Sequence, residues 1–256
     1  VQAEAPLFGL DKESAEQIRV VGPLVAVWLL VFSIPIVLFT PDTKSTGVPM
    51  LEAVRRGLRQ LHGTFMNLWQ HRQTALFLVA RMIYTDGLNT LFAFGGIFAA
   101  GTFGMPMAEV IKFGILLNVT AGIGALGFAW VDDWIGAKPT ILIALAGLIV
   151  TGAIAISVQD VTWFWIAGAF LGIFVGPAQA ASRSLMGRIA PPEMRGEMFG
   201  LYALSGKASA FLGPFVLGTV TYLTASQRLG MATILAFFVV GGILLALMRH
   251  PNLQRA

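Results

Sequence analysis

The sequence predicts an all-α membrane protein, a bundle of helices that each cross the bilayer. Of its 256 residues 56% are hydrophobic and 12% charged, which is about half the charged fraction of an ordinary soluble domain. Long uncharged runs recur between short polar breaks, and each is near the ~20 residues that a spanning helix needs. A soluble helical domain is disfavoured, because its helices would keep a polar face that most of these runs lack. The seven expected spans are 18–39, 73–100, 107–131, 139–158, 161–184, 196–224 and 228–249.

Basic residues predict how this bundle is oriented. Fourteen Lys and Arg residues lie outside the expected spans or within two residues of their ends, and eleven of them fall on alternate connections. The positive-inside rule places those connections on the cytoplasmic side, so the chain starts outside and ends inside. The eleven are Lys44, Arg55, Arg56, Arg59, Arg72, Lys138, Arg183, Arg188, Arg195, Arg249 and Arg255. Membrane topology thus accounts for the net charge of +4 without a nucleic-acid partner.

The first segment, 1–39, is expected to be an external N-terminal stretch followed by one span. It starts at Val1, and no basic region precedes an apolar run in the manner of a signal peptide. Seven spans with an external start predict the last part of a longer protein with an even number of spans. We therefore expect five earlier spans, in a missing N-terminal half of the same protein.

The connection 40–72 carries an apolar stripe with basic residues on its other faces. Its apolar residues recur at steps of three and four, which predicts a basic amphipathic helix along the cytoplasmic surface. The simpler interpretation is an interfacial connector, and the alternative is a binding segment for a partner of the calmodulin type. The stripe is Leu51, Val54, Leu58, Leu61, Phe65 and Leu68.

The span 73–100 contains the polar stretch "RMIYTDGLNT". Asp86, Asn89 and Thr90 are spaced for one helical face, and such a strip must face the bundle interior or water. This strip is the leading candidate for a substrate or coupling site. Arg81 lies five residues before Asp86, which is the wrong spacing for an ion pair within the helix. One interpretation is structural, with its long side chain extending back to the cytoplasmic surface, and the alternative is a functional role.

Lys207, in the span 196–224, is the expected partner of Asp86. Each stands about a dozen residues from the cytoplasmic end of its span, so both are expected near mid-membrane. Opposite charges at matched depth predict a buried ion pair. The pair is either a static salt bridge or one that a substrate or a proton breaks and reforms.

Glycine and proline punctuate the later spans. Gly168, Gly172 and Gly176 lie on one face of 161–184, which predicts close approach of a neighbouring helix. The steps Gly176-Pro177 and Gly213-Pro214 each favour a bend within a span. In transporters such breaks expose backbone beside a cavity, and the alternative is a passive kink.

The sequence "GFAWVDDWIGAKPT" after the third span resembles the loop signature of the major facilitator superfamily. Asp133, Gly136 and Lys138 match that signature, whereas Trp134 and Ala137 replace basic positions. Two longer stretches, "YTDGLNTLFAFGGIFA" and "GPAQAASRSLMGRIAPPEMRGEMFGLYALSGKASAFLGP", resemble one branch of the superfamily. That branch is the autophagy-related vacuolar amino-acid effluxers and their bacterial relatives.

The resemblance implies a twelve-helix transporter that works by alternating access. This chain would carry its sixth helix (1–39), the connector 40–72, the C-terminal six-helix bundle 73–249 and a cytoplasmic tail, 250–256. The residues expected near the substrate path or coupling site are Asp86, Asn89, Thr90, Asn118, Gln179 and Lys207. A cytoplasmic gate is expected from the loop signature and the basic residues opposite it, namely Asp133, Gly136, Lys138, Arg183, Arg188 and Arg195.

The partners implied are a small-molecule substrate, protons and the lipid bilayer of a bacterial cytoplasmic membrane. An amino acid is the substrate that the vacuolar members suggest. The alternative function is a non-transporting scaffold or receptor on the same fold, which would gain little from intramembrane charges. No enzyme is expected because no nucleophile and base stand together, and no cofactor or metal site is expected because His62, His71 and His250 lack a second ligand at metal spacing.

Overall fold

The computed structural model describes residues 16–41, 47, 49–52, 54, 55, 57, 59, 63 and 72–249. Helices dominate this part of the chain, and none of the described residues lies in a strand. The chain divides into two units, Val1–Gly57 and Leu58–Ala256, each of which is described by itself. The all-α prediction is confirmed.

The first unit contains α1 (Glu16–Arg19) and α2 (Val21–Phe39). α2 is apolar around its whole circumference and none of its side chains is buried, as expected of a helix whose neighbours are lipid or other helices. The described residues of the predicted connector helix, among them Leu51, Val54 and Arg55, are helical. The rest of that predicted helix lies outside the described residues.

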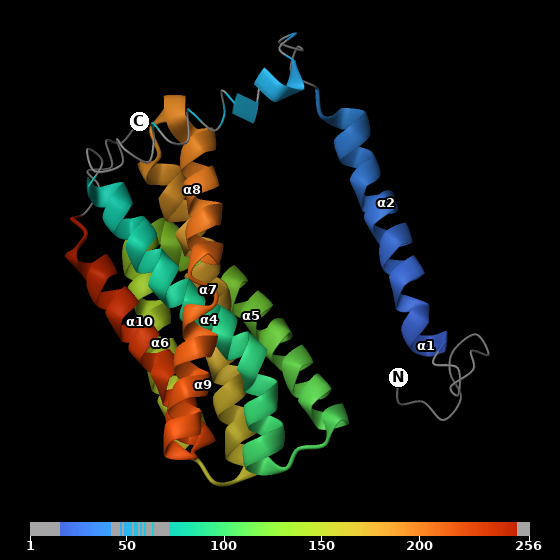
Figure 1. The fold of residues 1–256 in the computed structure, drawn as a ribbon, viewed down its shortest axis with the longest axis vertical. Coiled ribbons are helices and arrows are strands. Elements are labelled where there is room, and N and C mark those ends of the chain that lie inside the picture. The colour runs from blue at the N-terminus through green and yellow to red at the C-terminus, as the bar shows by residue number, and fades with distance from the viewer. Residues whose placement is uncertain are drawn as a thin grey trace. The chain divides into compact units, whose positions relative to one another are not determined.

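The second unit is a bundle of long helices joined by short turns at both ends (Figure 1). In the described part of the chain, six helices are long and apolar enough to cross a membrane: α2, α5, α6, α7, α8 with α9, and α10. α4 has 32 residues but is not one of the six, so the span predicted at 73–100 is a helix that is less apolar than expected. The bundle helices are α4 (Arg72–Phe103), α5 (Met107–Ile135), α6 (Ala137–Ser157), α7 (Val161–Ile189), α8 (Arg195–Ala208), α9 (Leu212–Thr224) and α10 (Gln227–Leu247).

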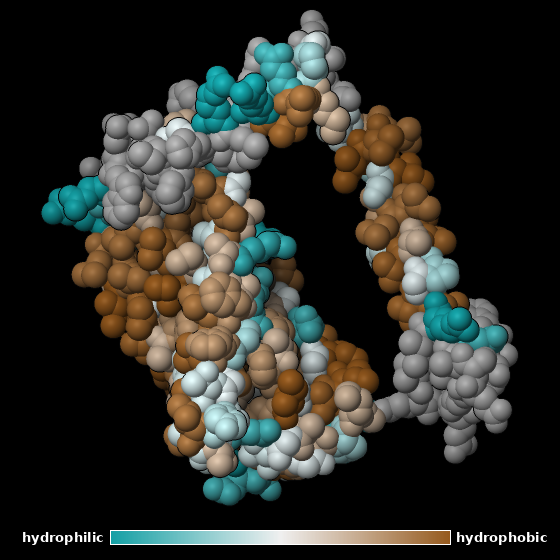
Figure 2. All heavy atoms as spheres, viewed as in Figure 1, coloured by the Kyte–Doolittle hydropathy of each residue, from teal (hydrophilic) through white to brown (hydrophobic). Residues whose placement is uncertain are grey.

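The outer surface of the bundle matches a membrane environment. On the face shown in Figure 2, apolar residues cover the sides of the helices, and hydrophilic residues gather at the lower end in this view. Trp134 at one end of the bundle and Trp163 at the other are 88% and 61% exposed. Tryptophan is enriched at both membrane–water interfaces, so these two positions fit the borders of the spanning region.

α7 packs closely against α5, as its glycines predict. A Cβ atom at Gly172 would collide with Thr120 Oγ1, and one at Gly176 would collide with the carbonyl oxygen of Ala121. Any larger residue at these positions would push the two helices apart. The small-residue face predicted on α7 is therefore confirmed.

α6 and α10 bind each other at both ends. Lys138 Nζ, at the start of α6, donates to the backbone carbonyl oxygens of Ala246, at 3.0 Å, and Met248, where α10 ends. Arg228, at the start of α10, donates from Nη1 to the carbonyl of Val158, at 2.7 Å, just past the end of α6. The last carbonyls of a helix have no partner within it, so each cation satisfies the free end of the other helix.

The span predicted at 196–224 is broken into two helices. α8 ends at Ala208, the turn Ser209–Phe211 follows, and α9 starts at Leu212. Pro214 lies in the first turn of α9, where its missing N–H leaves no hydrogen bond unmade. α7 is one continuous helix through Pro177. Only the second Gly-Pro step therefore lies beside a break in its helix.

Candidate substrate and gating sites

Asp86 of α4 lies against the broken helix. Its side chain is 1% exposed, and Oδ2 accepts a hydrogen bond from the backbone N–H of Gly213 at 3.0 Å. Thr90 Oγ1 donates to the carbonyl oxygen of Asp86 at 2.8 Å, and a Cβ atom at Gly213 would collide with that hydroxyl. The first N–H groups of a helix have no partner within it, so a side chain of α4 caps the start of α9.

The predicted ion pair between Asp86 and Lys207 is wrong for this conformation. Oδ2 of Asp86 binds Gly213, and Oδ1 is buried without a hydrogen-bond partner among the described residues. Lys207 is exposed, on the other side of the break. Matched depth along two helices does not fix which way each side chain points, and the break supplies a backbone N–H that satisfies part of the carboxylate.

A polar pocket of about 260 Å³ lies between α4, α7 and α8. Arg81, Arg183 and Lys207 bring three positive charges to it, and no Asp or Glu is among its lining residues. Its other lining residues are Tyr84, Thr85, Leu88, Asn89, Ala178, Gln179, Ser182, Tyr202, Ala203 and Gly206. The polar pocket is therefore a positively charged concavity.

Arg81 is held against α8. Its Nη1 donates to the backbone carbonyl of Tyr202 at 2.6 Å and to Ser205 Oγ at 2.8 Å. Its guanidinium carbon lies 3.5 Å from the centre of the Tyr202 ring, and a Cβ at Gly206 would lie 2.9 Å from Nη1. The expectation that Arg81 extends to the cytoplasmic surface is wrong, because a carbonyl, a hydroxyl and an aromatic face bind the guanidinium within the bundle.

Further hydrogen bonds join α4 to the helices around the polar pocket. Asn89 Nδ2 donates to the carbonyl of Gly206 at 3.3 Å. The hydroxyls of Tyr84 and Ser182 lie 2.6 Å apart, and each of these residues is 1% exposed. α4 therefore forms a fixed wall of the pocket, bound to α8 on one side and to α7 on the other.

The predicted substrate residues separate into three places. Asn89, Gln179 and Lys207 line the polar pocket. Asp86 and Thr90 are buried beside α9, so the single polar strip expected from their spacing with Asn89 is not formed.

The prediction missed four residues that line the polar pocket, Tyr84, Thr85, Ser182 and Tyr202, and assigned Arg183 to the gate. The spacing of Arg81, Thr85, Leu88 and Asn89 is that of one helical face and could have identified this side of α4.

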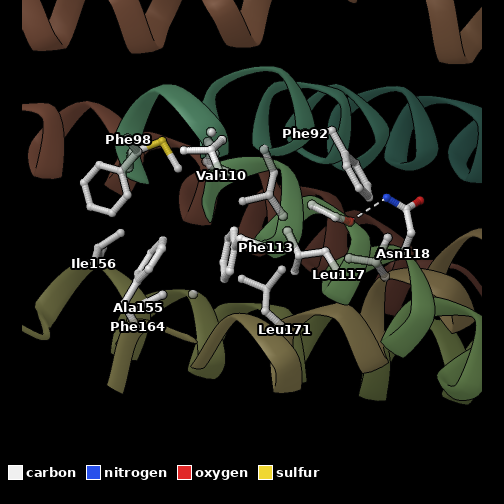
Figure 3. A pocket seen from close by; sticks show the side chains of 18 of the residues that line it. Phe92, Phe98, Val110, Phe113, Leu117, Asn118, Ala155, Ile156, Phe164 and Leu171 are labelled. Atoms are coloured by element: carbon white, nitrogen blue, oxygen red, sulfur yellow. Dashed lines mark hydrogen bonds between the residues drawn. The ribbon is translucent and has the colours of Figure 1, made fainter. Parts of the chain in front are cut away.

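Asn118 lies apart from the polar pocket, at an apolar cavity of about 330 Å³ (Figure 3). It is the only polar side chain among the residues that line this cavity, and its amide donates to the carbonyl of Gly114 at 2.8 Å in its own helix. In Figure 3 Asn118 and Phe92 lie at one end, and Phe98 and Phe164 at the other. The structure does not bring Asn118 together with the other predicted residues.

The predicted gate contains an ion pair between α5 and α7. Nη2 of Arg188 lies 3.2 Å from Oδ1 of Asp132 and 3.9 Å from Oδ1 of Asp133. The Asp132 side chain is 13% exposed and that of Asp133 is 80% exposed. Asp132, which the loop signature did not single out, is therefore the closer and better shielded partner of Arg188.

The other predicted gate residues have different places. Gly136 turns the chain between α5 and α6 at a φ of +92°, which is strained for a residue with a Cβ. Lys138 binds the end of α10, and Arg183 lines the polar pocket. Arg195 starts α8 and is exposed. In the described part of the chain, Arg188 alone of the predicted basic gate residues pairs with the loop carboxylates.

Comparison with known proteins gives a family and several distant relatives. The sequence matches the family described as "Vacuole effluxer Atg22 like" over residues 5–255. It is 24% identical over 229 residues to Autophagy-related protein 22 of Coccidioides immitis, covering 80% of this chain and 38% of that protein. It is 22% identical over 193 residues to the uncharacterized MFS-type transporter YxiO of Bacillus subtilis, covering 75% of this chain and 45% of that protein. The chain thus spans less than half the length of these relatives.

Proposed function

Because the chain belongs to the family of Atg22-like vacuole effluxers, we propose that it is part of a secondary active transporter that moves a small solute by alternating access. The family match confirms the resemblance that the loop signature and the two longer stretches indicated. The chain is an integral membrane protein with several spanning helices, and its relatives include an MFS-type transporter.

The observation that carries the proposal is the contact of Asp86 with the break between α8 and α9. A buried carboxylate whose second oxygen has no hydrogen-bond partner among the described residues is costly in a bundle held together by apolar contacts. A scaffold would gain nothing from that cost. In a transporter the Asp86 carboxylate can bind a proton, which weakens its hydrogen bond from the Gly213 N–H. Protonation would then alter the angle between α8 and α9.

The helices around these groups would line the path of the solute. α4, α7 and the α8–α9 pair carry the polar pocket and the capped break, and α5 with α7 carries the Arg188–Asp132 ion pair at the end of the bundle that we propose to be cytoplasmic. We propose that 73–249 is one half of a two-half transporter. The ion pair would close the cytoplasmic side, and opening it would admit the solute.

We propose that the solute is an amino acid and that transport is coupled to protons through Asp86. We also propose that the direction is export from the compartment where the solute accumulates. The printed family description, a vacuole effluxer, supports efflux. Similarity to the Bacillus subtilis protein supports a bacterial cytoplasmic membrane. We propose no enzymatic activity, since the matching family and the Bacillus subtilis relative are described as an effluxer and a transporter.

The full-length protein reconstituted in proteoliposomes tests this function. A mixture of radiolabelled amino acids should move across the membrane with a proton gradient and stop when the gradient is dissipated. Asp86→Asn should abolish the dependence on the gradient, whereas Asp160→Asn, which neutralises a carboxylate in a loop, should retain it. Absence of movement of any amino acid in a properly folded protein would reject the amino-acid proposal, and gradient-dependent transport by Asp86→Asn would reject the coupling role.

A further inference from the structure

The residues that line the polar pocket carry a net positive charge. Arg81, Arg183 and Lys207 line it, and no Asp or Glu is among its lining residues. Asp86 binds the start of α9, and Asp132 pairs with Arg188. Three cations around one concavity repel each other, so an anion that enters lowers the electrostatic energy of the site.

We propose that the polar pocket binds the carboxylate of a small solute, with Lys207 and Arg183 as its charged ligands. This inference rests on the proposed transporter and names the chemical group that its pocket recognises. Neither Arg183 nor Lys207 makes an ion pair with a described residue, so both charges are available. The amides of Asn89 and Gln179 line the same pocket and supply neutral donors.

Arg81 is the positioning residue of this site. Two hydrogen bonds to α8 and the face of Tyr202 fix its guanidinium, and the Nη1 atom makes both of those bonds. In the described structure the Nη2 atom makes none, so a fixed positive group borders the pocket. A charge held in place loses little conformational freedom when an anion arrives, so Arg81 attracts the carboxylate toward Lys207 and Arg183.

The same lining disfavours a positively charged group. No carboxylate lines the pocket, so an ammonium placed there would meet three like charges. A zwitterionic solute would therefore enter with its carboxylate toward Lys207 and Arg183 and its ammonium directed away from them. The recognised class is a small carboxylate, and a neutral amide of the same shape should bind poorly.

A single cysteine at the rim measures this charge directly. Ala203 lines the pocket and is exposed, and residues 1–256 contain no cysteine. In full-length protein without other cysteines, Ala203→Cys should react faster with the negatively charged reagent methanethiosulfonate ethylsulfonate than with its trimethylammonium counterpart. Lys207→Gln or Arg183→Gln should each lower the ratio of the two rates several-fold, since a positive charge in the pocket affects the two reagents in opposite directions. Lys112→Gln, which removes a cation from α5 outside the pocket, should leave the ratio unchanged.

Three probes of similar shape test the ligand class: propionate, propionamide and propylammonium. Propionate should slow the reaction of the introduced cysteine with a neutral reagent, and this protection should disappear in Lys207→Gln, while the amide and the amine give none. Equal protection by propionate and propionamide would overturn the proposal. A ratio of rates that stays unchanged in Lys207→Gln and Arg183→Gln would also overturn the proposal. That result is expected if these cations pair with acidic groups elsewhere in the full-length protein.

The lipid provides the other source of an anion. The measurements are therefore repeated in vesicles of phosphatidylcholine alone and with phosphatidylglycerol added. Protection by propionate in both compositions supports the solute carboxylate, and protection by phosphatidylglycerol without any effect of propionate overturns it. Because no transport is measured, protection by propionate in a protein that transports nothing would retain the site and reject the transporter. Transport by a protein whose pocket shows no charge selectivity would retain the transporter and reject the carboxylate site.

Discussion

The Asp86 carboxylate accepts a hydrogen bond from the backbone N–H of Gly213 at 3.0 Å, so a side chain of one helix caps the start of another. Position 213 requires glycine for this contact, because a Cβ atom there would collide with Thr90 Oγ1. The contact also uses the break at Ser209–Phe211, which frees the N–H group that an unbroken helix would bind itself. The buried charge, the close approach and the break thus depend on one another.

Gly213→Ala should destabilise the bundle by about 1–3 kcal/mol, because the added methyl group would collide with Thr90 Oγ1. Thr90→Ala removes that hydroxyl and should restore part of the loss in the double variant. Denaturant unfolding in detergent measures both effects. Gly218→Ala in the same helix is the control, since a Cβ there meets nothing within 4 Å. A Gly213→Ala protein as stable as Gly218→Ala would contradict the close packing.

Lys138→Met should cost about 1–3 kcal/mol in the same measurement, since it leaves the carbonyls of Ala246 and Met248 without their donor. Lys138→Arg keeps a charged donor and should recover part of the stability. Lys112→Met serves as the matched control, because Lys112 is exposed on α5. The loop signature would instead assign Lys138 to gating; a variant with normal stability and altered transport would favour that assignment over the structural role.

The spans could be predicted because apolar length alone determines whether a helix crosses a membrane. The apolar length of α4 alone did not identify its surroundings, since a carboxylate such as Asp86 is acceptable in a span only where other helices cover it. The approach of α7 to α5 was also predictable, because small residues four apart have one structural use in such helices.

Partners across helices were harder to predict. Depth within the membrane follows from residue number, but rotation of one helix against another follows from packing, which a single sequence does not display. Asp86 and Lys207 matched in depth, yet one side chain points to Gly213 and the other lines the polar pocket. Arg188 and the loop carboxylates were easier to pair, because both lie at helix ends at the same end of the bundle.

The start of α7 should respond to acid through Asp160. Its side chain accepts hydrogen bonds from the backbone N–H groups of Thr162, at 2.7 Å, and Trp163, and these bonds lower the pKa of the carboxyl. A lowered pKa in the folded state adds stability above the unfolded value of about 3.9, and this is lost as the pH falls through the folded pKa.

Wild-type protein should therefore have a higher Tm than Asp160→Asn at pH 6, and the difference should shrink as the pH falls from about 4. Thermal unfolding in detergent across that range measures it. Glu109→Gln, at the start of α5, gives the comparison for a second carboxylate in a first helical turn. A difference that stays constant down to pH 2 would contradict the capping role of the ionised carboxylate.

Asp132→Asn should open the cytoplasmic side more than Asp133→Asn. Asp132 lies closer to Arg188, and its side chain is largely shielded from water, whereas an exposed partner 3.9 Å away contributes little. Opening is measured as the rate at which a membrane-impermeant thiol reagent, added from the cytoplasmic side, labels a cysteine placed at Gln179. Asp160→Asn is the control at the opposite end. A larger effect of Asp133→Asn would favour Asp133 as the main gate carboxylate, as the loop signature predicted.

Asp86→Asn and Lys207→Gln should act independently on stability. Asp86 is buried and caps α9, so its variant changes a contact within the bundle, whereas Lys207 is exposed and its removal should be nearly neutral. The double variant should equal the sum of the two within about 0.5 kcal/mol, because the residues share no partner in the described structure. Unfolding of all four proteins in the same detergent gives this coupling energy. A buried ion pair predicts the reverse, with each single variant costing about 3–5 kcal/mol and the double variant recovering most of the loss. Transport measured on the same proteins adds a second test. If only Asp86→Asn loses gradient dependence and only Lys207→Gln loses solute binding, then Asp86 is a coupling group and Lys207 a substrate ligand. Identical defects in both variants would show that the two charges form one functional unit.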